Sequence, residues 1–330
     1  MAKYNPENIK TIGVYASGGD APGMNAAIRA VVRTAILRKL RVVGITQGYT
    51  GMLEKQFADM DLRSVANIIQ RGGSILKAGR CPEFIKTENR KIAVDNLRSE
   101  GIDALVCIGG DGSFTAANLL WQEHKIPVVG VPGTIDNDIF GTDHTIGFDT
   151  AVNTALDAID RIRDTAASHD RLFIIEVMGR DSGFIAVASG LAGGAEDIFI
   201  PEHPFQIDKT VDLIKRGMAR GKNSSILVAA EGVKPGRAYD LAESIRKNSG
   251  HLATVCILGH IQRGGRPSAF DRLIASRMGS NAVDQLLSGN CDIMVGTKGD
   301  NLVHVELSEC LKQKKHVNKD LIQLAQILSN

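Results

Sequence analysis

Short runs of apolar residues alternate with longer segments of helical periodicity along most of the chain. In the first half these runs are bounded by glycine or polar residues and lie at 11–17, 41–45 and 103–110. The second half repeats the pattern at 172–179, 197–202, 224–232 and 253–260. Continuous apolar runs are typical of parallel strands that are covered on both faces. The alternation therefore predicts an open, layered α/β fold.

Two segments show the spacing of a helix with one buried stripe. The first begins near Met24, directly after a Gly/Pro turn, and continues through 26–39. The second follows Asp149, where apolar side chains recur every three or four residues, at Val152, Ala155, Leu156, Ile159 and Ile162. We expect two α/β halves that meet near 145–150 without a low-complexity linker.

The composition is that of an ordinary folded protein without a large charged surface. Apolar residues make up 43% and charged residues 23% of the 330-residue chain, which excludes a disordered protein. The 39 basic and 37 acidic residues give a net charge of +2, and no dense basic block occurs. Nucleic acid and membranes are therefore not expected as partners, since no apolar run reaches the roughly 18 residues of a membrane span.

The cysteines and the first residues of the chain bear on its compartment. The five cysteines are scattered and show no CxxC spacing, which argues against a zinc site or a disulfide framework. Residues 1–10 lack the apolar stretch of a secretion signal. We therefore expect reduced thiols and a cytoplasmic protein.

Glycine is the one enriched residue type, and its excess lies in loops directly after predicted strands. The first such loop, 17–25, reads SGGDAPGMN and leads into the first predicted helix. Glycine lets the backbone approach a ligand, and the free N–H groups at a helix start favour an anion. A tight strand-to-helix turn without a ligand is an equally good interpretation of this loop taken alone.

The second glycine loop, 108–113, reads IGGDGS and also opens a helix. It is neither GxGxxG nor a P-loop with its lysine. A bare backbone of this kind can wrap a phosphate chain, while the carboxylate of Asp111 faces the Mg²⁺ that neutralises the phosphates. The two loops follow parallel strands, so both should lie at the carboxyl edge of one sheet, where open α/β folds bind ligands.

The third loop, 132–138, reads PGTIDND and carries two carboxylates, Asp136 and Asp138. In an extended loop, residues spaced two apart point the same way. One carboxylate can then accept a proton while the other helps to hold a metal, as attack of a hydroxyl on a phosphoryl group requires. The alternative is an Asx-rich turn with capping aspartates. The presence of the Asp111 loop one strand earlier favours chemistry.

A fourth group of polar residues lies at or just beyond the ends of strands in the second half. It comprises the segment 176–180 (EVMGR), Glu231 and the segment 260–265 (HIQRGG). Arg180 and Arg263 can hold phosphate oxygens, and Glu231 can accept sugar hydroxyls. Each charged residue alone is more often part of a surface ion pair, and His260 alone is more often a buried imidazole with satisfied hydrogen bonds. Their repetition at successive strand ends favours a binding site.

In their order along the chain, these motifs resemble the bacterial type of ATP-dependent 6-phosphofructokinase. The resemblance covers about residues 9–310, and PGTIDND with GHIQRGG is its most specific part. It implies an α/β fold of two three-layer αβα domains with mostly parallel sheets. The implied ATP-binding domain comprises 1–146 and about 261–313, and the implied sugar-phosphate domain comprises about 147–260 and 314–330.

The resemblance also implies roles for the matching residues. Asp136 is the implied general base for the 1-hydroxyl of fructose 6-phosphate, with Thr134 and Asp138 around it, while Asp111 places Mg²⁺. Arg80 and Arg180 are the implied stabilisers of the transferred phosphoryl group. The implied ATP-binding residues are Gly19, Arg80, Cys81, Gly110, Asp111, Gly112 and Ser113. The implied sugar-phosphate residues are Thr134, Asp136, Arg171, Met178, Gly179, Arg180, Glu231, His260 and Arg263. A homotetramer is also implied, because Arg171 reaches in from a neighbouring subunit.

Two glycines bear on the phosphoryl donor. Pyrophosphate-using relatives place a carboxylate where this chain has Gly112 and a lysine where it has Gly133. A carboxylate at 112 would repel and crowd the α-phosphate of a nucleotide, whereas glycine leaves space. We therefore expect ATP as the donor. Ala116, where the family usually has glycine, adds a methyl group beside the nucleotide.

The chain departs from the family pattern at two places. Thr254 stands where a second cross-subunit arginine binds the sugar phosphate, and the loss of one such contact costs about 1.5–3 kcal/mol, roughly ten- to a hundredfold in affinity. Arg266 is a candidate replacement for the missing arginine.

The effector site of the family is matched at Arg29, Arg33, Arg163, Gly194, Glu196, Arg220 and Lys222. It lacks an arginine at Leu62 and a Lys-His pair at 223–224, so we expect a muted or altered response to ADP and phosphoenolpyruvate.

Three other functions compete with phosphorylation of fructose 6-phosphate. The acceptor could be another ketose phosphate, such as sedoheptulose 7-phosphate. A non-catalytic paralogue that regulates a partner subunit is the second alternative, supported by Thr254 and the reduced effector site. Against it stand the complete GGDGS and PGTIDND loops, because a dead enzyme has no chemical need for Asp136. A dinucleotide-dependent oxidoreductase ranks last, since no GxGxxG follows the first strand.

Overall fold

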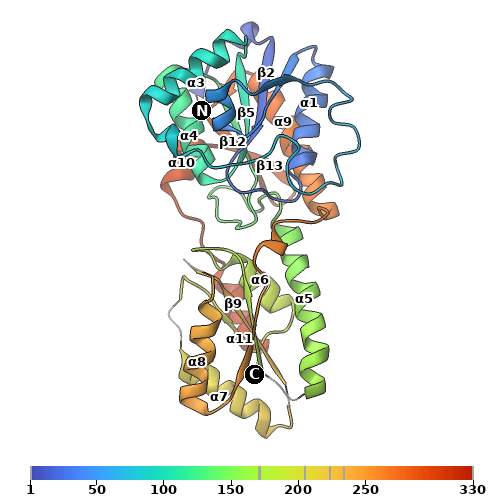
Figure 1. The fold of residues 1–330 in the computed structure, drawn as a ribbon, viewed down its shortest axis with the longest axis vertical. Coiled ribbons are helices and arrows are strands. Elements are labelled where there is room, and N and C mark those ends of the chain that lie inside the picture. Colours follow the sequence, from blue (N-terminus) through green and yellow to red (C-terminus); the bar gives the residue numbers. More distant parts are fainter. Residues whose placement is uncertain (1, 170–171, 204–205, 223, 233–234, 329–330) are drawn as a thin grey trace. The chain divides into compact units, whose positions relative to one another are not determined.

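The computed structural model describes residues 2–169, 172–203, 206–222, 224–232 and 235–328. They form two compact units, each with a sheet of its own (Figure 1). Unit 1 comprises 1–134, 139–149 and 263–315, and unit 2 comprises 135–138, 150–262 and 316–330. The sequence places the first boundary after 146, whereas the structure has it after 149 and groups 135–138 with unit 2.

Unit 1 is built on a seven-stranded sheet in the order β13-β12-β6-β5-β2-β3-β4. The five inner strands are parallel, and the edge strands β4 and β13 are antiparallel to their neighbours. The bounds are β2 Thr11–Ala16, β3 Arg41–Ile45, β4 Phe57–Asp59, β5 Ala104–Gly109, β6 Val128–Pro132, β12 Ile293–Lys298 and β13 Asn301–Glu306. A separate antiparallel pair joins β1 (Ala2–Lys3) to β11 (Asn290–Cys291). The strands expected at 11–17, 41–45 and 103–110 are thereby confirmed.

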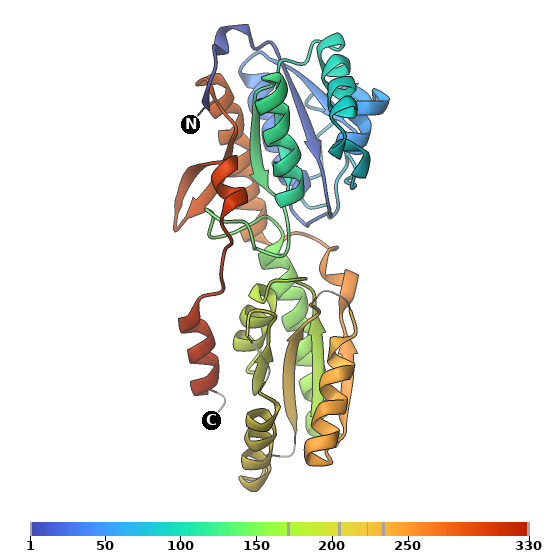
Figure 2. The same cartoon turned by 90° about the vertical axis from the view of Figure 1, so that its left-hand side faces the viewer.

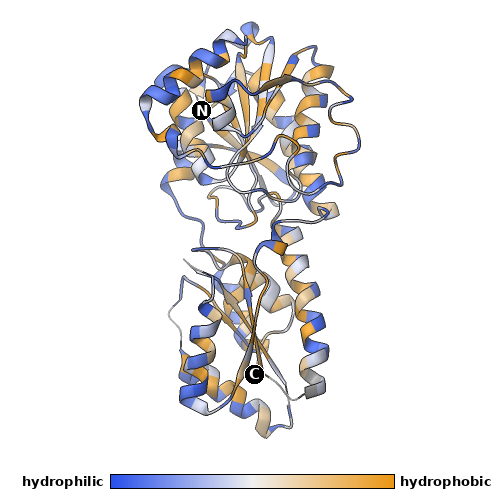
Figure 3. Cartoon of the chain, in the orientation of Figure 1, coloured by the Kyte–Doolittle hydropathy of each residue, from blue (hydrophilic) through white to orange (hydrophobic). Residues whose placement is uncertain are grey.

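Helices cover both faces of this sheet (Figure 1). Helices α1 and α9 pack together on one face, while α3, α4 and α10 lie on the other. The helix bounds are α1 Met24–Leu37, α2 Tyr49–Glu54, α3 Thr87–Ser99, α4 Asp111–His124, α9 Ala269–Leu287 and α10 Leu307–Lys312, with the 3₁₀ turns η1 Pro6–Asn8 and η2 Pro82–Ile85. Hydropathy follows the layers, because the strands are apolar and polar residues lie on the outer sides of the helices (Figure 3).

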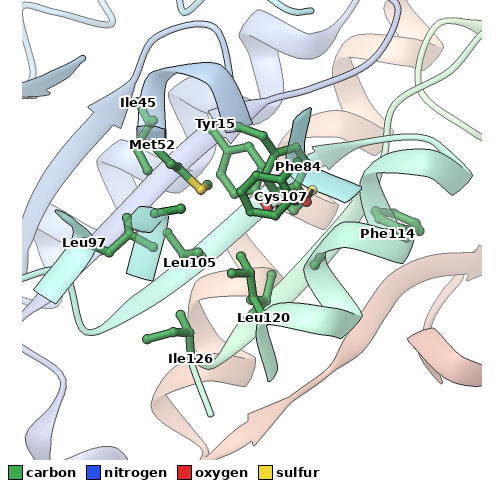
Figure 4. Close-up of a cluster of buried hydrophobic side chains, with 14 of the residues drawn as sticks. Tyr15, Ile45, Met52, Phe84, Leu97, Leu105, Cys107, Phe114, Leu120 and Ile126 are labelled. Atoms are coloured by element: carbon green, nitrogen blue, oxygen red, sulfur yellow. Dashed lines mark hydrogen bonds between the residues drawn. The ribbon is translucent and has the colours of Figure 1, made fainter. Parts of the chain in front are cut away.

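The core of unit 1 contacts the glycine loops directly (Figure 4). Tyr15 and Tyr49 are fully or almost fully buried, and the Tyr15 hydroxyl donates to the Tyr49 hydroxyl at 2.8 Å. Tyr49 in turn donates to the carbonyl oxygen of Ser113 at 2.6 Å. Burial raises the pKa of both phenols well above its ordinary value, so both remain neutral donors. The core therefore fixes the first turn of α4, where Ser113 lies.

Unit 2 is built on a four-stranded, all-parallel sheet in the order β10-β7-β9-β8. Helices α7 and α8 pack on one face, around a core that includes Ile174, Leu227 and Leu241, and α6 packs on the other face with α11 beside it (Figure 2). The strand bounds are β7 Leu172–Val177, β8 Asp197–Phe199, β9 Ser225–Ala230 and β10 Ala253–Ile257. The helix bounds are α5 Phe148–His169, α6 Phe184–Ala192, α7 Ile207–Ala219, α8 Arg237–Ser249 and α11 Lys319–Leu328, with the 3₁₀ turn η3 Gly259–Gln262.

The predicted strands of the second half are confirmed, with one correction. The apolar run at 253–260 was expected to be buried on both faces, but β10 is an edge strand that pairs only with β7. Thr254 and Ile257 are therefore exposed. In the described part of the chain, no helix is long and apolar enough to cross a membrane.

Candidate active site

The glycine loops of unit 1 meet at the carboxyl edge of its sheet. The backbone N–H of Ser17 donates to the carbonyl oxygen of Ile108 at 3.0 Å, which joins the loops after β2 and β5. The N–H of Gly133 donates to the carbonyl of Gly109 at 2.9 Å, which adds the loop after β6. Parallel neighbours place their carboxyl ends together, so the topology of unit 1 brings the first two sequence motifs and the start of the third, 132–134, into one place.

Arg80 and Cys81 lie beside these loops. The N–H of Gly18 donates to the carbonyl of Gly79 at 3.0 Å, so the residue before Arg80 is bonded to the first glycine loop. Arg80 is exposed and Cys81 half-buried. The structure thus gathers the predicted nucleotide residues of the first two loops and of 80–81 within unit 1.

Two of these glycines have opposite surroundings. A Cβ atom at Gly109 would lie 2.5 Å from the Ser113 Oγ atom and 2.7 Å from the carbonyl oxygen of Ser17, so the loops can touch only because this residue has no side chain. At Gly112, no atom outside its chain neighbours and the backbone of α4 itself lies within 4 Å of the position that a Cβ would take. The first turn of α4 therefore presents open space next to Asp111.

The residues present fit a magnesium ion that is held mainly by phosphates. Asp111 is exposed and begins α4, where the partial positive charge of a helix N-terminus favours anions. Among the described residues, no group of three or more His, Cys, Asp or Glu side chains could form a metal cage. Mg²⁺ is usually bound through one or two carboxylates plus substrate phosphates. A single exposed carboxylate at the start of a helix suits this mode.

In unit 2, Asp136 lies in a turn that the structure holds tightly. Its residue is 7% exposed, and its carbonyl oxygen accepts a hydrogen bond from the Ser182 hydroxyl at 2.9 Å. The expectation of an extended loop, in which Asp136 and Asp138 point the same way, is wrong, because Asn137 between them has a left-handed backbone with φ of 52°. Asn tolerates this conformation better than most residues. Asp136 is buried and Asp138 half-buried, so their environments differ.

The segment 178–182 forms a second turn, next to Glu231. The backbone N–H of Met178 donates to the side-chain oxygen of Gln262 at 2.8 Å, and Gln262 is fully buried. The N–H of Arg180 donates to a carboxylate oxygen of Glu231 at 3.3 Å. Three predicted sugar-phosphate residues of unit 2, Met178, Arg180 and Glu231, are therefore neighbours. Sequence analysis assigned no role to Gln262, which the HIQRGG motif contains.

Two carboxylates, the buried Glu176 and the half-buried Glu202, hold the helices that follow these turns. Glu176 is 1% exposed and accepts hydrogen bonds from the N–H groups of Gly236 (2.7 Å) and Ala238 (2.8 Å) at the start of α8. Glu202 accepts from the N–H of Gly183 at 2.8 Å, just before α6. The guanidinium of Arg237 interacts electrostatically with both carboxylates, while burial lowers its pKa. In the sequence, Glu176 is recognisable as a glutamate inside the apolar run 172–179.

Replacing Glu176 with glutamine is expected to destabilise unit 2. An amide oxygen can accept only one of the two backbone hydrogen bonds well, and the buried NH₂ group then faces N–H donors. We expect the free energy of unfolding to fall by about 2–3 kcal/mol, measured by urea denaturation. Glu243→Gln, on the exposed face of α8, is the matched control, and an equal small loss in both variants would contradict the role of Glu176.

Some predicted residues are not gathered with this group. Arg263 belongs to unit 1, where its guanidinium donates to the carbonyl of Asp20 at 3.4 Å and lies against Gly19. His260 is exposed in η3. Arg171 lies outside the described residues. The roles of these three residues in binding the sugar phosphate stay predictions.

Part of the predicted effector group is assembled in unit 2. Arg163 donates to the carbonyl oxygens of Gly193 and, at 3.0 Å, Gly194. Lys222 forms an ion pair with the buried Glu196. Arg220 caps the end of α7, while Arg29 and Arg33 lie one turn apart on α1 of unit 1. Leu62 is 48% exposed at the position where an arginine is expected, and residue 223 lies outside the described residues.

Unit 1 has a mostly parallel sheet with glycine loops at its carboxyl edge, one of which leads into Asp111. This arrangement defines a nucleotide-binding α/β protein. Its second unit carries carboxylate and arginine side chains. The model of the family described as "Phosphofructokinase" matches residues 11–286. The chain is 54% identical over 321 residues to "ATP-dependent 6-phosphofructokinase 1" of Thermus thermophilus, covering 97% of this chain and 100% of the relative. It therefore belongs to the phosphofructokinase family.

Solved structures agree with this assignment. The phosphofructokinase of Saccharomyces cerevisiae superposes with a TM-score of 0.85 at 37% identity, over 92% of this chain and 45% of the yeast chain. This chain thus spans less than half the length of the yeast chain that it matches. A pyrophosphate-dependent phosphofructokinase from Marinobacter aquaeolei superposes with a TM-score of 0.83 at 26% identity, over 97% of this chain and 91% of that one. The fold of two α/β units is confirmed.

Proposed function

We propose that the protein transfers the γ-phosphoryl group of ATP to the 1-hydroxyl of fructose 6-phosphate, giving fructose 1,6-bisphosphate and ADP in glycolysis. The loop 132–138 carries this proposal. Thr134, near the start of this loop, lies beside Gly110: a Cβ atom added to Gly110 would be 3.7 Å from the Cβ of Thr134. Thr134 therefore belongs with the nucleotide loops of unit 1. Two residues on, Asp136 is buried and bonded through its backbone to the Arg180 turn of unit 2.

In the proposed mechanism, the carboxylate of Asp136 removes the proton from the 1-hydroxyl of the sugar. The hydroxyl oxygen attacks the γ-phosphorus, the bond from that phosphorus to the bridging oxygen breaks, and ADP leaves with the electron pair. Arg80 and Arg180 stabilise the charge on the transferred group through their guanidinium groups, and Asp138 and Thr134 position the sugar and phosphate. Asp111 would hold Mg²⁺, which supplies charge neutralisation of the phosphates when bound.

Gly112 and Gly133, the two positions at which ATP-using and pyrophosphate-using relatives differ, favour ATP as the phosphoryl donor. Gly112 leaves the space that a nucleotide α-phosphate needs. At Gly133, a Cβ would lie 3.0 Å from Ile108 and 3.1 Å from Met24, so the lysine of pyrophosphate-using relatives does not fit without movement. The Thermus thermophilus relative is named for ATP dependence, in line with this proposal.

Initial rates test the proposed activity directly. Purified protein with Mg²⁺ is assayed with ATP or pyrophosphate as the donor, and with fructose 6-phosphate or sedoheptulose 7-phosphate as the acceptor. We expect the highest kcat/KM with ATP and fructose 6-phosphate. Faster turnover with sedoheptulose 7-phosphate would change the acceptor, and no turnover with any pair would favour a regulatory paralogue.

A cytoplasmic homotetramer with a weakened effector site is also proposed. Apolar side chains lie exposed near the edge strand β10, since Leu252 is 78% and Ile261 61% exposed, and such residues are commonly covered in assemblies. The predicted contribution of Arg171 to a neighbouring subunit requires assembly.

The expected response to effectors is muted, and titration of the activity with ADP and phosphoenolpyruvate tests this expectation. Strong effects of both compounds at physiological concentrations would contradict it.

The threonine at position 254 favours a different acceptor or a reduced affinity for fructose 6-phosphate. It is exposed on β10, so an arginine there would meet no steric barrier within unit 2. Thr254→Arg is expected to lower the KM for fructose 6-phosphate by roughly tenfold or more, because it adds one charge-assisted contact to phosphate. Thr254→Gln, of similar length but uncharged, is the control. Equal KM values for both variants would show that residue 254 does not reach the sugar phosphate.

A further inference from the structure

A large pocket in unit 2 is lined by none of the residues of the proposed active site. Its volume is about 730 Å³, within the range of about 300–1,000 Å³ of sites for small molecules. Its walls come from α6, β8, α7 and α11. Of the residues assigned above to catalysis, substrates or effectors, only Glu196 lines it. The pocket therefore calls for an explanation of its own.

The floor of the pocket is apolar. Phe199 of β8 and the adjoining Ile200 are each 3% exposed, and Val187 of α6 is 2% exposed. Ile322 and Ala325 of α11 also line the pocket. Such walls favour an apolar ligand body, because its burial removes apolar surface from water.

The rim of the pocket carries positive charge on two separate helices. Lys209 and Arg216 lie two turns apart on α7, and Lys319 begins α11. Within the described ranges, none of these three cations forms an ion pair. Asp212 lies between the two on α7 and is the one exposed carboxylate among the described residues that line the pocket.

The other two carboxylates of the wall are already engaged in the fold. Glu196 pairs with Lys222 and accepts from the N–H of Ile226. Asp197 accepts from the Thr210 hydroxyl and from its neighbouring backbone N–H, and burial raises its pKa. The cations are thus available to a ligand, whereas these two carboxylates are not.

Helix α11 contributes one part of the pocket lining. It has no buried residue in its described length, and its packing on unit 2 involves α6 and β8. A ligand that touches both α7 and α11 would join these two helices across the pocket. Binding should therefore fix α11 on unit 2.

We propose that this pocket binds an amphiphilic organic anion, with its apolar body on Phe199 and Ile322 and its acidic group between Lys209, Arg216 and Lys319. The class is defined by one carboxylate or phosphate joined to an apolar chain or ring. The proposal does not depend on the proposed catalytic function, because the pocket shares no catalytic residue.

Isothermal titration calorimetry with decanoate, kept below its micelle concentration, tests this proposal on the full chain. We expect one saturable site per chain in the wild type. The variant Lys209→Gln/Arg216→Gln should bind about tenfold more weakly, and Lys91→Gln, an exposed lysine of α3, should bind as the wild type does. Decan-1-ol, which has the same chain without the charge, should bind at least tenfold more weakly than decanoate.

A second variant and a competition experiment locate the ligand. Ile322→Asp, which puts a carboxylate on the α11 wall, is expected to abolish binding while leaving turnover of ATP and fructose 6-phosphate unchanged. Saturating ATP and fructose 6-phosphate should not displace decanoate. Absence of a binding heat in the wild type, equal affinity in the double variant, or displacement by the substrates would each overturn the proposal.

Discussion

Replacement of Asp136 by asparagine is expected to lower kcat about 10³-fold, with changes in KM for both substrates below about threefold. Removal of a general base typically costs a factor of about 10²–10⁴, and the amide cannot accept the proton of the sugar hydroxyl. The two side chains have the same shape, and the hydrogen bond that the turn accepts from Ser182 goes to the backbone of residue 136, not to its side chain. Steady-state kinetics over both substrates measure the effect.

The control for this variant is a change of the same chemical type in an exposed position. Asp95→Asn on α3 should retain wild-type kcat and KM. Circular dichroism and thermal unfolding of Asp136→Asn should match the wild type, which separates a catalytic loss from unfolding. A kcat within a factor of five of the wild type would remove Asp136 from the role of base.

Gly112→Asp is expected to raise the KM for ATP on the order of 100-fold. A carboxylate beside the α-phosphate meets a like charge at a few ångströms, where repulsion amounts to a few kcal/mol even at an effective dielectric constant of about 20. Folding should be unaffected, because open space surrounds the Cβ position and aspartate is favourable in the first turn of a helix. The KM for fructose 6-phosphate should stay within about twofold.

Gly112→Asn separates charge from size at the same position. Its side chain has almost the volume of aspartate but no charge, so the KM for ATP should rise by no more than about tenfold. If both variants raise the KM equally, crowding and not repulsion is the cause. If neither raises it, the open space beside Asp111 does not hold the nucleotide, and ATP binds elsewhere on the molecule.

Much of the fold follows from local patterns in the sequence. The apolar runs at 11–17, 103–110 and 172–179 are strands because continuous β-rich segments bury both faces of a parallel sheet. The rule that ligands bind at the carboxyl ends of such strands then predicts that the first two glycine loops meet, as the bond from Ser17 to Ile108 shows. The bond from Gly133 to Gly109 adds the start of the third loop.

What could not be predicted depends on contacts between distant segments. The exposure of β10 follows from its place at the sheet edge, and the same apolar run would be buried in a central strand. The left-handed backbone of Asn137 interrupts the extended loop that was expected between Asp136 and Asp138. Arg237 faces Glu176 and Glu202 from a third element, and no spacing along the chain encodes that arrangement.

The identity of the transferred group and of the accepting hydroxyl tests the central claim most directly. ATP labelled with ³²P at the γ-phosphate is incubated with fructose 6-phosphate, Mg²⁺ and the wild-type protein, and the product is separated and its phosphates are located by ³¹P NMR on an unlabelled parallel sample. We predict that the label moves to the 1-hydroxyl of the sugar in the wild type and stays in ATP with Asp136→Asn. Label released as inorganic phosphate, or found on another hydroxyl, would contradict the account.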